Sequence, residues 1–280
     1  MIVLSAPGRV GNAPMPMRLL RLFALLGATV VVVLPLYWVL TTSLKPSADI
    51  YDFSTLVPHR LTCQHYCYIL QERGVARWLG FSAVVAAGST LLTLLLVCPW
   101  AYYAARHASR LSRHLIKAVA LLGFLVPSVF LAILIKDVYG GWLDNSYYSL
   151  IVLHPILQVP VCLWLLEAAI RRVPREYEEM VYVDGGSAAQ ALMHGVLPSC
   201  VPALAAASAI SVWLSWTNYS FPLLLGTPPG EETVTTGLAR LHSGDVFEWG
   251  PLMAAALLTV VASTPMLAVS CRAVGRAFVE

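Results

Sequence analysis

Three residues with metal-binding side chains lie close together in one short polar segment: Cys63, His65 and Cys67. Thiolates and imidazoles are preferred zinc ligands, and two nearby cysteines can also form a disulfide. The spacing matches no common zinc pattern, and a structural zinc site needs a fourth ligand. We therefore expect free thiols and no bound metal, with a metal site or a disulfide as the alternatives.

Two further ionisable side chains, Glu167 and His154, lie at or within apolar runs. A charge inside a membrane indicates a functional site by default. Arg171 follows Glu167 by four residues, however, so an ion pair near the membrane surface is the favoured interpretation. For His154, which precedes Pro155, we favour a hydrogen-bonded structural role over a proton relay.

Catalytic motifs are absent from the sequence. There is no Gly-x-x-x-x-Gly-Lys-[Ser/Thr] phosphate loop, and none of the three lysines follows a glycine. His-Glu-x-x-His and Gly-x-Ser-x-Gly are missing too. We expect a chain that is not an enzyme, binds no cofactor itself and does not hydrolyse ATP.

The composition places much of the chain in lipid. Only 12% of the 280 residues are charged and 58% are hydrophobic, whereas soluble domains carry about 25% charged residues. The net charge of +3, without a basic patch, argues against a nucleic-acid partner. The apolar stretch after Arg18 and Arg21 is too long for a signal peptide, so we expect a retained first span.

Six stretches lack charged residues, and all but the fifth, which has 46 residues, are near the roughly 20 residues that cross a bilayer as a helix. They lie between residues 21 and 45, 77 and 106, 117 and 136, 144 and 167, 184 and 231, and 248 and 272. The fifth stretch begins with a polar, glycine-containing part, so we assign its span to residues 201–225. Several spans contain prolines that can kink them: Pro35, Pro99, Pro127, Pro155, Pro160 and Pro265.

The distribution of basic residues sets the orientation of these spans. With six spans and a cytoplasmic N-terminus, 12 of the 18 Lys and Arg residues lie inside and 6 outside. This asymmetry follows the positive-inside rule. We expect an all-α, multi-pass protein of the bacterial plasma membrane, with both termini and the 171–198 loop in the cytoplasm.

The loop at residues 171–198 has the pattern of two short helices. Pro174 suits a first helical position, and acidic residues follow near the positive helix end. Gly185 and Gly186 can end this helix. Ser187 and Gln190 have capping-box spacing for a second helix, over residues 188–197, which Pro198 should close. The pair can transmit a push from a cytoplasmic partner, or it can be an ordinary interfacial helix.

The segment Glu179-Met180-Val181-Tyr182-Val183-Asp184-Gly185-Gly186, followed by Leu197-Pro198, resembles the EAA loop of binding-protein-dependent ABC importer permeases. Glu179, Asp184, Gly185, Leu197 and Pro198 match that pattern position by position. Met180 and Val181 depart from its paired alanines, and Gly186 departs from the alanine after its glycine.

Other segments resemble the maltose-type, carbohydrate-uptake branch of this family. They are Leu34-Pro35-Leu36-Tyr37-Trp38 with Thr42-Ser43-Leu44-Lys45-Pro46, Trp216-Thr217-Asn218-Tyr219 with Pro222-Leu223-Leu224-Leu225, and Trp249-Gly250-Pro251-Leu252-Met253-Ala254-Ala255. The resemblance implies a single membrane domain over residues 1–280 whose loop at about 171–198, including Gly186, Ser187 and Gln190, docks on an ATPase.

The resemblance also implies partners: a second homologous permease, two ATP-binding cassette subunits that carry ATP and Mg, and an external solute-binding protein. The expected solute is a sugar or oligosaccharide. A polar non-sugar such as a glycerophosphodiester is the alternative within the family, and a stand-alone secondary transporter or channel is the alternative outside it.

Trp213, Trp216, Asn218 and Tyr219 are candidates for the substrate pathway. Aromatic faces and an amide can hold a sugar by stacking and hydrogen bonding. The competing interpretation is an interfacial aromatic belt, or packing against the second permease.

Overall fold

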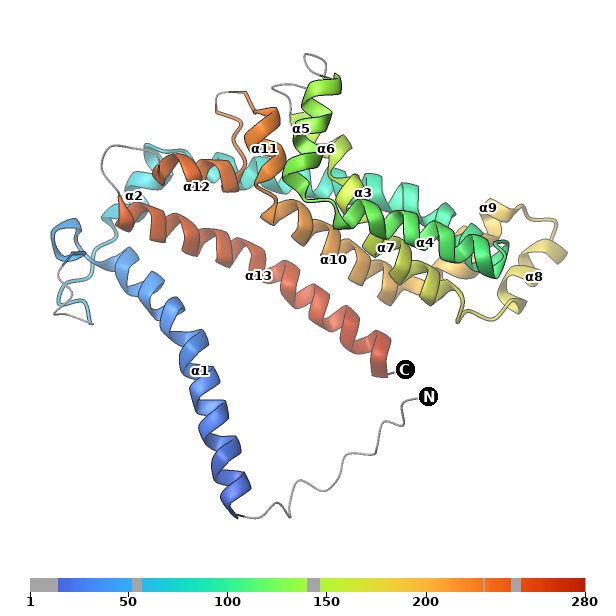
Figure 1. The fold of residues 1–280 in the computed structure, drawn as a ribbon, viewed down its shortest axis with the longest axis horizontal. Helices are drawn as coiled ribbons and strands as arrows, with labels where there is room; N and C mark the ends of the chain where they lie inside the picture. The colour runs from blue at the N-terminus through green and yellow to red at the C-terminus, as the bar shows by residue number, and fades with distance from the viewer. Residues whose placement is uncertain (1–14, 52–56, 140–146, 229, 243–247, 280) are drawn as a thin grey trace.

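The computed structural model describes residues 15–51, 57–139, 147–228, 230–242 and 248–279, and all regular structure in these ranges is helical (Figure 1). Arg9, one of the 12 basic residues assigned to the cytoplasmic side, and Asp144, which bounds the fourth uncharged stretch, lie outside the described residues. The elements are α1 (Met15–Leu44), η1 (Ser47–Asp49), α2 (Gln64–Gln71), α3 (Val75–Arg106), α4 (Arg110–Leu125), α5 (Ser128–Tyr139), α6 (Tyr147–Leu153), α7 (Pro155–Ile170), α8 (Glu176–Val183), α9 (Ala188–Gln190), η2 (Ala191–Val196), η3 (Leu197–Cys200), α10 (Val201–Thr217), α11 (Ser220–Leu225), α12 (Val234–His242) and α13 (Trp249–Val279).

Four helical stretches within the described residues are long and apolar enough to cross a membrane. They are Arg21–Leu44, Val75–Arg106, Tyr148–Ile170 and Ala188–Thr217. The bent pair α4–α5 is a fifth candidate, and α13 begins with a shorter apolar stretch, Trp249–Pro265. The predicted all-α class is confirmed over the described ranges, and the chain is a multi-pass membrane protein.

The interval expected to hold the third span is not one straight helix. The axes of α4 and α5 differ by 90°, and Pro127 lies at the break between them. Val126, the residue before this proline, has an extended backbone with φ −71° and ψ 124°. Proline disfavours the helical conformation at the residue before it, which is the physical cause of the break.

The prediction that Pro198 ends a separate helix is wrong. Residues from Ala188 to Thr217 form one 30-residue helical stretch. Its hydrogen-bonding changes to π-helical over Ala191–Val196 and to 3-10 over Leu197–Cys200, with Pro198 in the first turn of the latter. These irregular turns accommodate the missing N–H of the proline, so the helix continues.

The predicted fifth span, residues 201–225, also ends earlier than expected. Asn218 is extended, with φ −70° and ψ 124°, and it ends α10 at Thr217. The short helix α11 follows as a separate element. The span therefore starts before residue 201 and stops before residue 225, because residues 188–200 are helical and Asn218 is not.

The core is formed where α3, α7 and α10 pack together. Ala203 and Ala207 of α10 are buried there. Gln158 of α7 is fully buried; it accepts a hydrogen bond from Thr93 at 2.6 Å and donates to Ser89 at 3.2 Å. Hydrogen bonds between helices add to small-residue packing inside a membrane, and these link α7 to α3.

The two ends of this bundle carry different elements (Figure 1). The helices α8 and α9 lie at one end, and α2 and α12 lie at the opposite end. The helix α1 diverges from the bundle, and the apolar window of its Arg21–Leu44 stretch has no residue buried within the chain. Its apolar side chains are therefore available to lipid or to another protein.

Candidate functional site

The loop between α7 and α10 begins with α8, whose end is set by two glycines. Gly185 has φ +80°, which confirms the positive φ that its sequence context predicts. Its N–H donates to the Tyr182 carbonyl at 3.0 Å, and the Gly186 N–H donates to the Val181 carbonyl at 2.8 Å. This pair of bonds is a Schellman motif, and it ends the helix in a defined direction. Pro174 lies before Arg175, the N-cap of α8, and not in the first turn.

The next helical turn is started by the predicted capping box. The Gln190 N–H donates to Ser187 Oγ at 3.4 Å, and the Ser187 N–H donates to Gln190 Oε1 at 2.7 Å. Each bond satisfies a backbone donor that the start of a helix leaves free. The chain therefore changes direction between Val183 and Ala188 through local bonds alone.

Two glycines bring the backbones of this loop close together. A Cβ atom on Gly186 would lie 2.5 Å from Val181 Cγ1 and 2.8 Å from the Val181 carbonyl oxygen. A Cβ on Gly195 would lie 2.7 Å from the Tyr177 carbonyl oxygen. The helix α8 is thus packed directly on the π-helical turn η2. Residues with a side chain would hold the two segments apart.

The surface of this loop carries most of the predicted coupling residues. Glu179, Asp184, Ser187, Gln190 and Pro198 are exposed, whereas Leu197 is half-buried against the core. Large apolar side chains are exposed beside them: Tyr177 44%, Met180 58%, Tyr182 43%, Val183 86% and Met193 62%. Such a concentration of exposed apolar groups at one end of a molecule indicates an interaction surface.

The carboxylate beside Glu179 has a different environment that sequence reasoning missed. Glu178 is buried, and its Oε1 lies 2.5 Å from Arg106 Nε at the end of α3. Its Oε2 accepts a hydrogen bond from Tyr102 Oη at 2.7 Å. Arg106 also donates to the Val173 carbonyl at 2.8 Å. The positions of Ile170, Val173 and Glu178 along the chain do not indicate this contact, because the partner residues of Glu178 lie on α3.

Glu167 is buried in a cluster of three cations. The predicted partner, Arg171, is 3.9 Å away, whereas Arg113 Nε of α4 is 3.5 Å away and Lys117 Nζ of α4 is nearer still. The ion pair is therefore real, but its closest partners come from another helix. The carboxylate links α7 to the first turns of α4. His154 is buried, and its Nδ1 donates to the Leu150 carbonyl at 2.5 Å, a hydrogen bond that fits the predicted structural role.

The four substrate-pathway candidates divide into two pairs. Trp216 is 93% buried in a core cluster with Trp78 and Val234, and the Asn218 side chain accepts a hydrogen bond from the Phe221 N–H at 3.0 Å. Trp213 and Tyr219 are exposed, at 41% and 40%. Two of the four side chains are thus engaged within the chain, and two are open to a partner or solute.

The cysteine–histidine trio does not converge on one point. His65 is buried and its Nε2 lies 2.9 Å from the Lys45 carbonyl oxygen, while Cys63 and Cys67 are exposed and free. In the described part of the chain no three His, Cys, Asp or Glu side chains are grouped to hold a metal.

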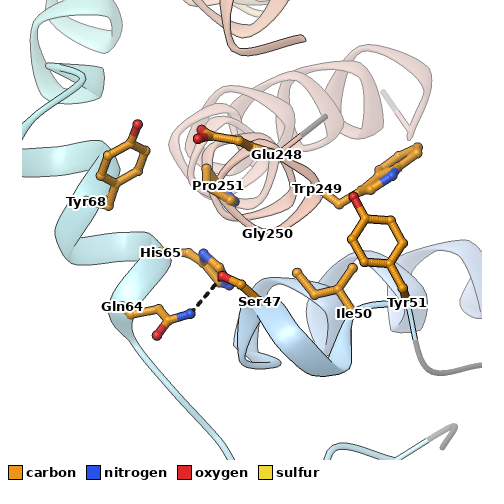
Figure 2. Close-up of a pocket in the computed structure, with 10 residues that line it drawn as sticks. All are labelled: Ser47, Ile50, Tyr51, Gln64, His65, Tyr68, Glu248, Trp249, Gly250 and Pro251. Carbon is orange, nitrogen blue, oxygen red and sulfur yellow. Dashed lines mark hydrogen bonds between the residues drawn. The ribbon is translucent and has the colours of Figure 1, made fainter. Parts of the chain in front are cut away.

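A pocket of about 500 Å³ lies beside His65, between α2, the segment of η1 and the two residues that follow it, and the start of α13 (Figure 2). Tyr51 and Trp249 form one side of it, and Tyr68 and Glu248 lie on the other (Figure 2). Gln64 donates to Ser47 at 3.0 Å at its edge. This pocket is at the end of the molecule opposite α8.

The class of protein is shown by comparison with known families. Residues 97–270, more than half of the chain, match the family described as binding-protein-dependent transport system inner membrane component. The chain belongs to this family, as its loop predicted.

Relatives and solved structures agree with this assignment. The chain is 28% identical over 247 residues to the diacetylchitobiose uptake system permease protein NgcG of Streptomyces coelicolor, covering 87% of this chain and 80% of that protein. It is 29% identical to the sulfoquinovosyl glycerol transport system permease protein SmoH of Agrobacterium fabrum, covering 84% and 82%. Its fold matches a chain of a bacterial ABC transporter involved in the import of the acidic polysaccharide alginate, with a TM-score of 0.76, 14% identity, and 93% and 98% coverage.

Proposed function

We propose that this chain is the permease subunit of an ATP-driven importer that brings a sugar or oligosaccharide into the cell. The observation that carries the proposal is the turn between α8 and α9, closed by a Schellman motif and a capping box at one end of an apolar bundle, in a chain of this family. A family that depends on a binding protein gives no support to the alternative of a stand-alone transporter or channel.

In this proposal the exposed face of α8 and the following turn is the coupling surface for an ATPase subunit. Val183 and Met180 supply apolar contacts, and Glu179 and Asp184 supply negative charge at its edge. The internal bonds of the Schellman motif and the capping box support this role, because a loop that must transmit force has to keep its shape. ATP and Mg are held by two partner ATPases, and this chain supplies no catalytic group.

The proposed arrangement in the membrane has six spans: α1, α3, the bent α4–α5 pair, α6–α7, the stretch from α9 through α10, and α13. The loop with α8 and both termini lie in the bacterial cytoplasm, and α2 and α12 lie outside. The exposed apolar side chains of α1 support contact with lipid and with a second, homologous permease.

The solute is proposed from the relatives, two of which are named for saccharide-containing solutes. Within this chain, Trp213 and Tyr219 are the pathway candidates whose side chains remain open. Their aromatic faces suit the apolar faces of sugar rings, and the second permease would complete the pathway. Trp216 and Asn218 support the pathway only by positioning the break between α10 and α11.

The test is to assemble the chain with its partner permease, its two ATPases and its binding protein in liposomes. The binding protein is first screened by thermal shift against N,N′-diacetylchitobiose, trehalose, maltose and glycerophosphocholine. The sugar that stabilises the binding protein should then be taken up in an ATP-dependent manner. If glycerophosphocholine alone stabilised the binding protein and was taken up, a sugar would be rejected as the solute. Uptake by the chain without ATPase subunits would reject the importer.

A further inference from the structure

The loop helix α8 is held to the bundle by a buried ionic contact as well as by the chain. Glu178 and Arg106 have side chains only 8% exposed, and their Oε1 and Nε atoms are 2.5 Å apart. Tyr102 Oη donates to the second carboxylate oxygen at 2.7 Å and lies 3.1 Å from Tyr182 Oη. Two polar side chains of α3, Arg106 and Tyr102, thus meet one face of α8 at Glu178 and Tyr182.

The Arg106 side chain contacts the chain at two places, one before α8 and one within α8. Arg106 Nη2 donates to the carbonyl of Val173, before α8, while its Nε faces Glu178 within α8. The guanidinium therefore fixes the position and the rotation of α8 relative to the end of α3. A buried ion pair is weak evidence for stability, because desolvation offsets the attraction. Its stronger effect is to define one geometry.

The helix α3 is suited to carry a displacement away from this contact. It runs without a break from Val75 to Arg106, 32 residues, with Pro99 inside it. It packs along α7 and α10 over much of its length. Its last turn continues into His107 and Ala108, whose N–H groups donate to the Tyr103 carbonyl at 2.9 and 3.1 Å.

The other contact of α8 is of a different kind. Gly195 brings η2 against the α8 backbone at Tyr177, without a charged or hydrogen-bonding side chain. That contact transmits compression but does not resist sliding or rotation. The contacts of Arg106 and Tyr102 with Glu178 can pull α3 as well as push it.

We propose that Arg106, Glu178 and Tyr102 form the joint through which movement of α8 is delivered to α3. They are positioning residues, since they lie behind the exposed surface that faces the ATPase. This proposal rests on the proposed function, because it requires an ATPase that moves α8. It assigns different roles to two adjacent carboxylates: Glu179 on the exposed surface and Glu178 in the joint.

The experiment measures amide hydrogen exchange in the full complex, in lipid nanodiscs, with and without ATP plus vanadate. Two peptides are followed: residues 176–190, which contain α8, and residues 103–109, which contain the end of α3. The variants are Glu178→Gln and the charge exchange Arg106→Glu with Glu178→Arg. Glu176→Gln is the matched control, because Glu176 is an exposed carboxylate on the same helix.

In the wild-type complex and in Glu176→Gln, nucleotide should change exchange in both peptides. In Glu178→Gln the change at residues 176–190 should remain and the change at residues 103–109 should be lost. The charge exchange should restore the second change. If nucleotide still changed hydrogen exchange in both peptides of the Glu178→Gln variant, the proposed joint would be overturned.

If Glu178→Gln fails to assemble, Tyr102→Phe decides the question, since it removes the hydrogen bonds to Glu178 and Tyr182 and leaves the ion pair. A smaller response at residues 103–109, with the α8 response intact, supports the joint, and an unchanged response overturns it. A wild-type complex that shows no nucleotide response at α8 would instead count against the proposed function.

Discussion

Replacing either of two adjacent glycines in the loop by alanine should destabilise the turn, and the physical reason differs between the two positions. At Gly186 a Cβ would lie 2.5 Å from Val181 Cγ1 and 2.8 Å from the Val181 carbonyl oxygen, so a neighbour must move. At Gly185 there is no atom within 4 Å of the Cβ position, but φ is +80°. The first penalty is steric and the second is conformational.

The expected magnitudes follow from these causes. Overpacking costs about 1–3 kcal/mol, so Gly186→Ala should weaken the turn by about 2 kcal/mol. An alanine in the left-handed region costs about 1 kcal/mol, which sets the expectation for Gly185→Ala. Because 1.4 kcal/mol is tenfold in an equilibrium constant, the turn should open roughly 30-fold and fivefold more often, respectively.

A second substitution separates the two mechanisms. Val181→Ala removes Cγ1, so it should recover roughly half of the loss in Gly186→Ala, about 1 kcal/mol of coupling. The carbonyl contact at 2.8 Å remains and accounts for the other half. In Gly185→Ala the same change should recover nothing, because Val181 does not touch that position.

The assay is hydrogen exchange of the Gly185 and Gly186 positions, whose N–H groups close the turn, resolved to single residues by fragmentation. Equal rescue of both glycine variants by Val181→Ala, or rescue of neither, would refute the steric explanation. Successful rescue would also explain why this loop departs from the EAA pattern at two positions. Val181 and Gly186 stand where the resembling pattern has alanines, and the larger residue at one position is matched by the smaller at the other.

Three further predictions concern the rest of the chain. In a cysteine-free background, Ser187→Cys should react with an impermeant maleimide only from the cytoplasmic side and Val57→Cys only from outside. Labelling of either position from the opposite side would contradict the proposed topology. Gly237→Ala should lower the melting temperature of the purified chain, at a cost of about 1–3 kcal/mol, because a Cβ there lies 2.3 Å from the Trp78 ring; an unchanged midpoint would contradict this close packing. Glu167→Gln should also destabilise, by less than the about 3–5 kcal/mol of a fully buried pair, since its cations are partly exposed; a fully stable variant in thermal unfolding would argue against the cation cluster.

The features that the sequence determined by itself are those that depend on neighbouring residues. The apolar stretches predict membrane helices because each backbone must satisfy its own hydrogen bonds in lipid. The end of α8 at Gly185 and the capping box of Ser187 and Gln190 were predictable because their partners lie within a few residues. The bend at Pro127 has the same local origin, since a proline acts on the residue before it.

The tertiary structure decided which of several similar residues is buried and what it contacts. Glu178 and Glu179 are adjacent and chemically identical, yet only Glu178 meets Arg106, because the end of α3 packs on one side of α8. On α10, Trp216 is in the core and Trp213 is exposed, because the core cluster that encloses Trp216 does not cover Trp213. Such choices depend on which helix faces lie together, and residue spacing within one helix carries no information about the face that a distant helix will cover.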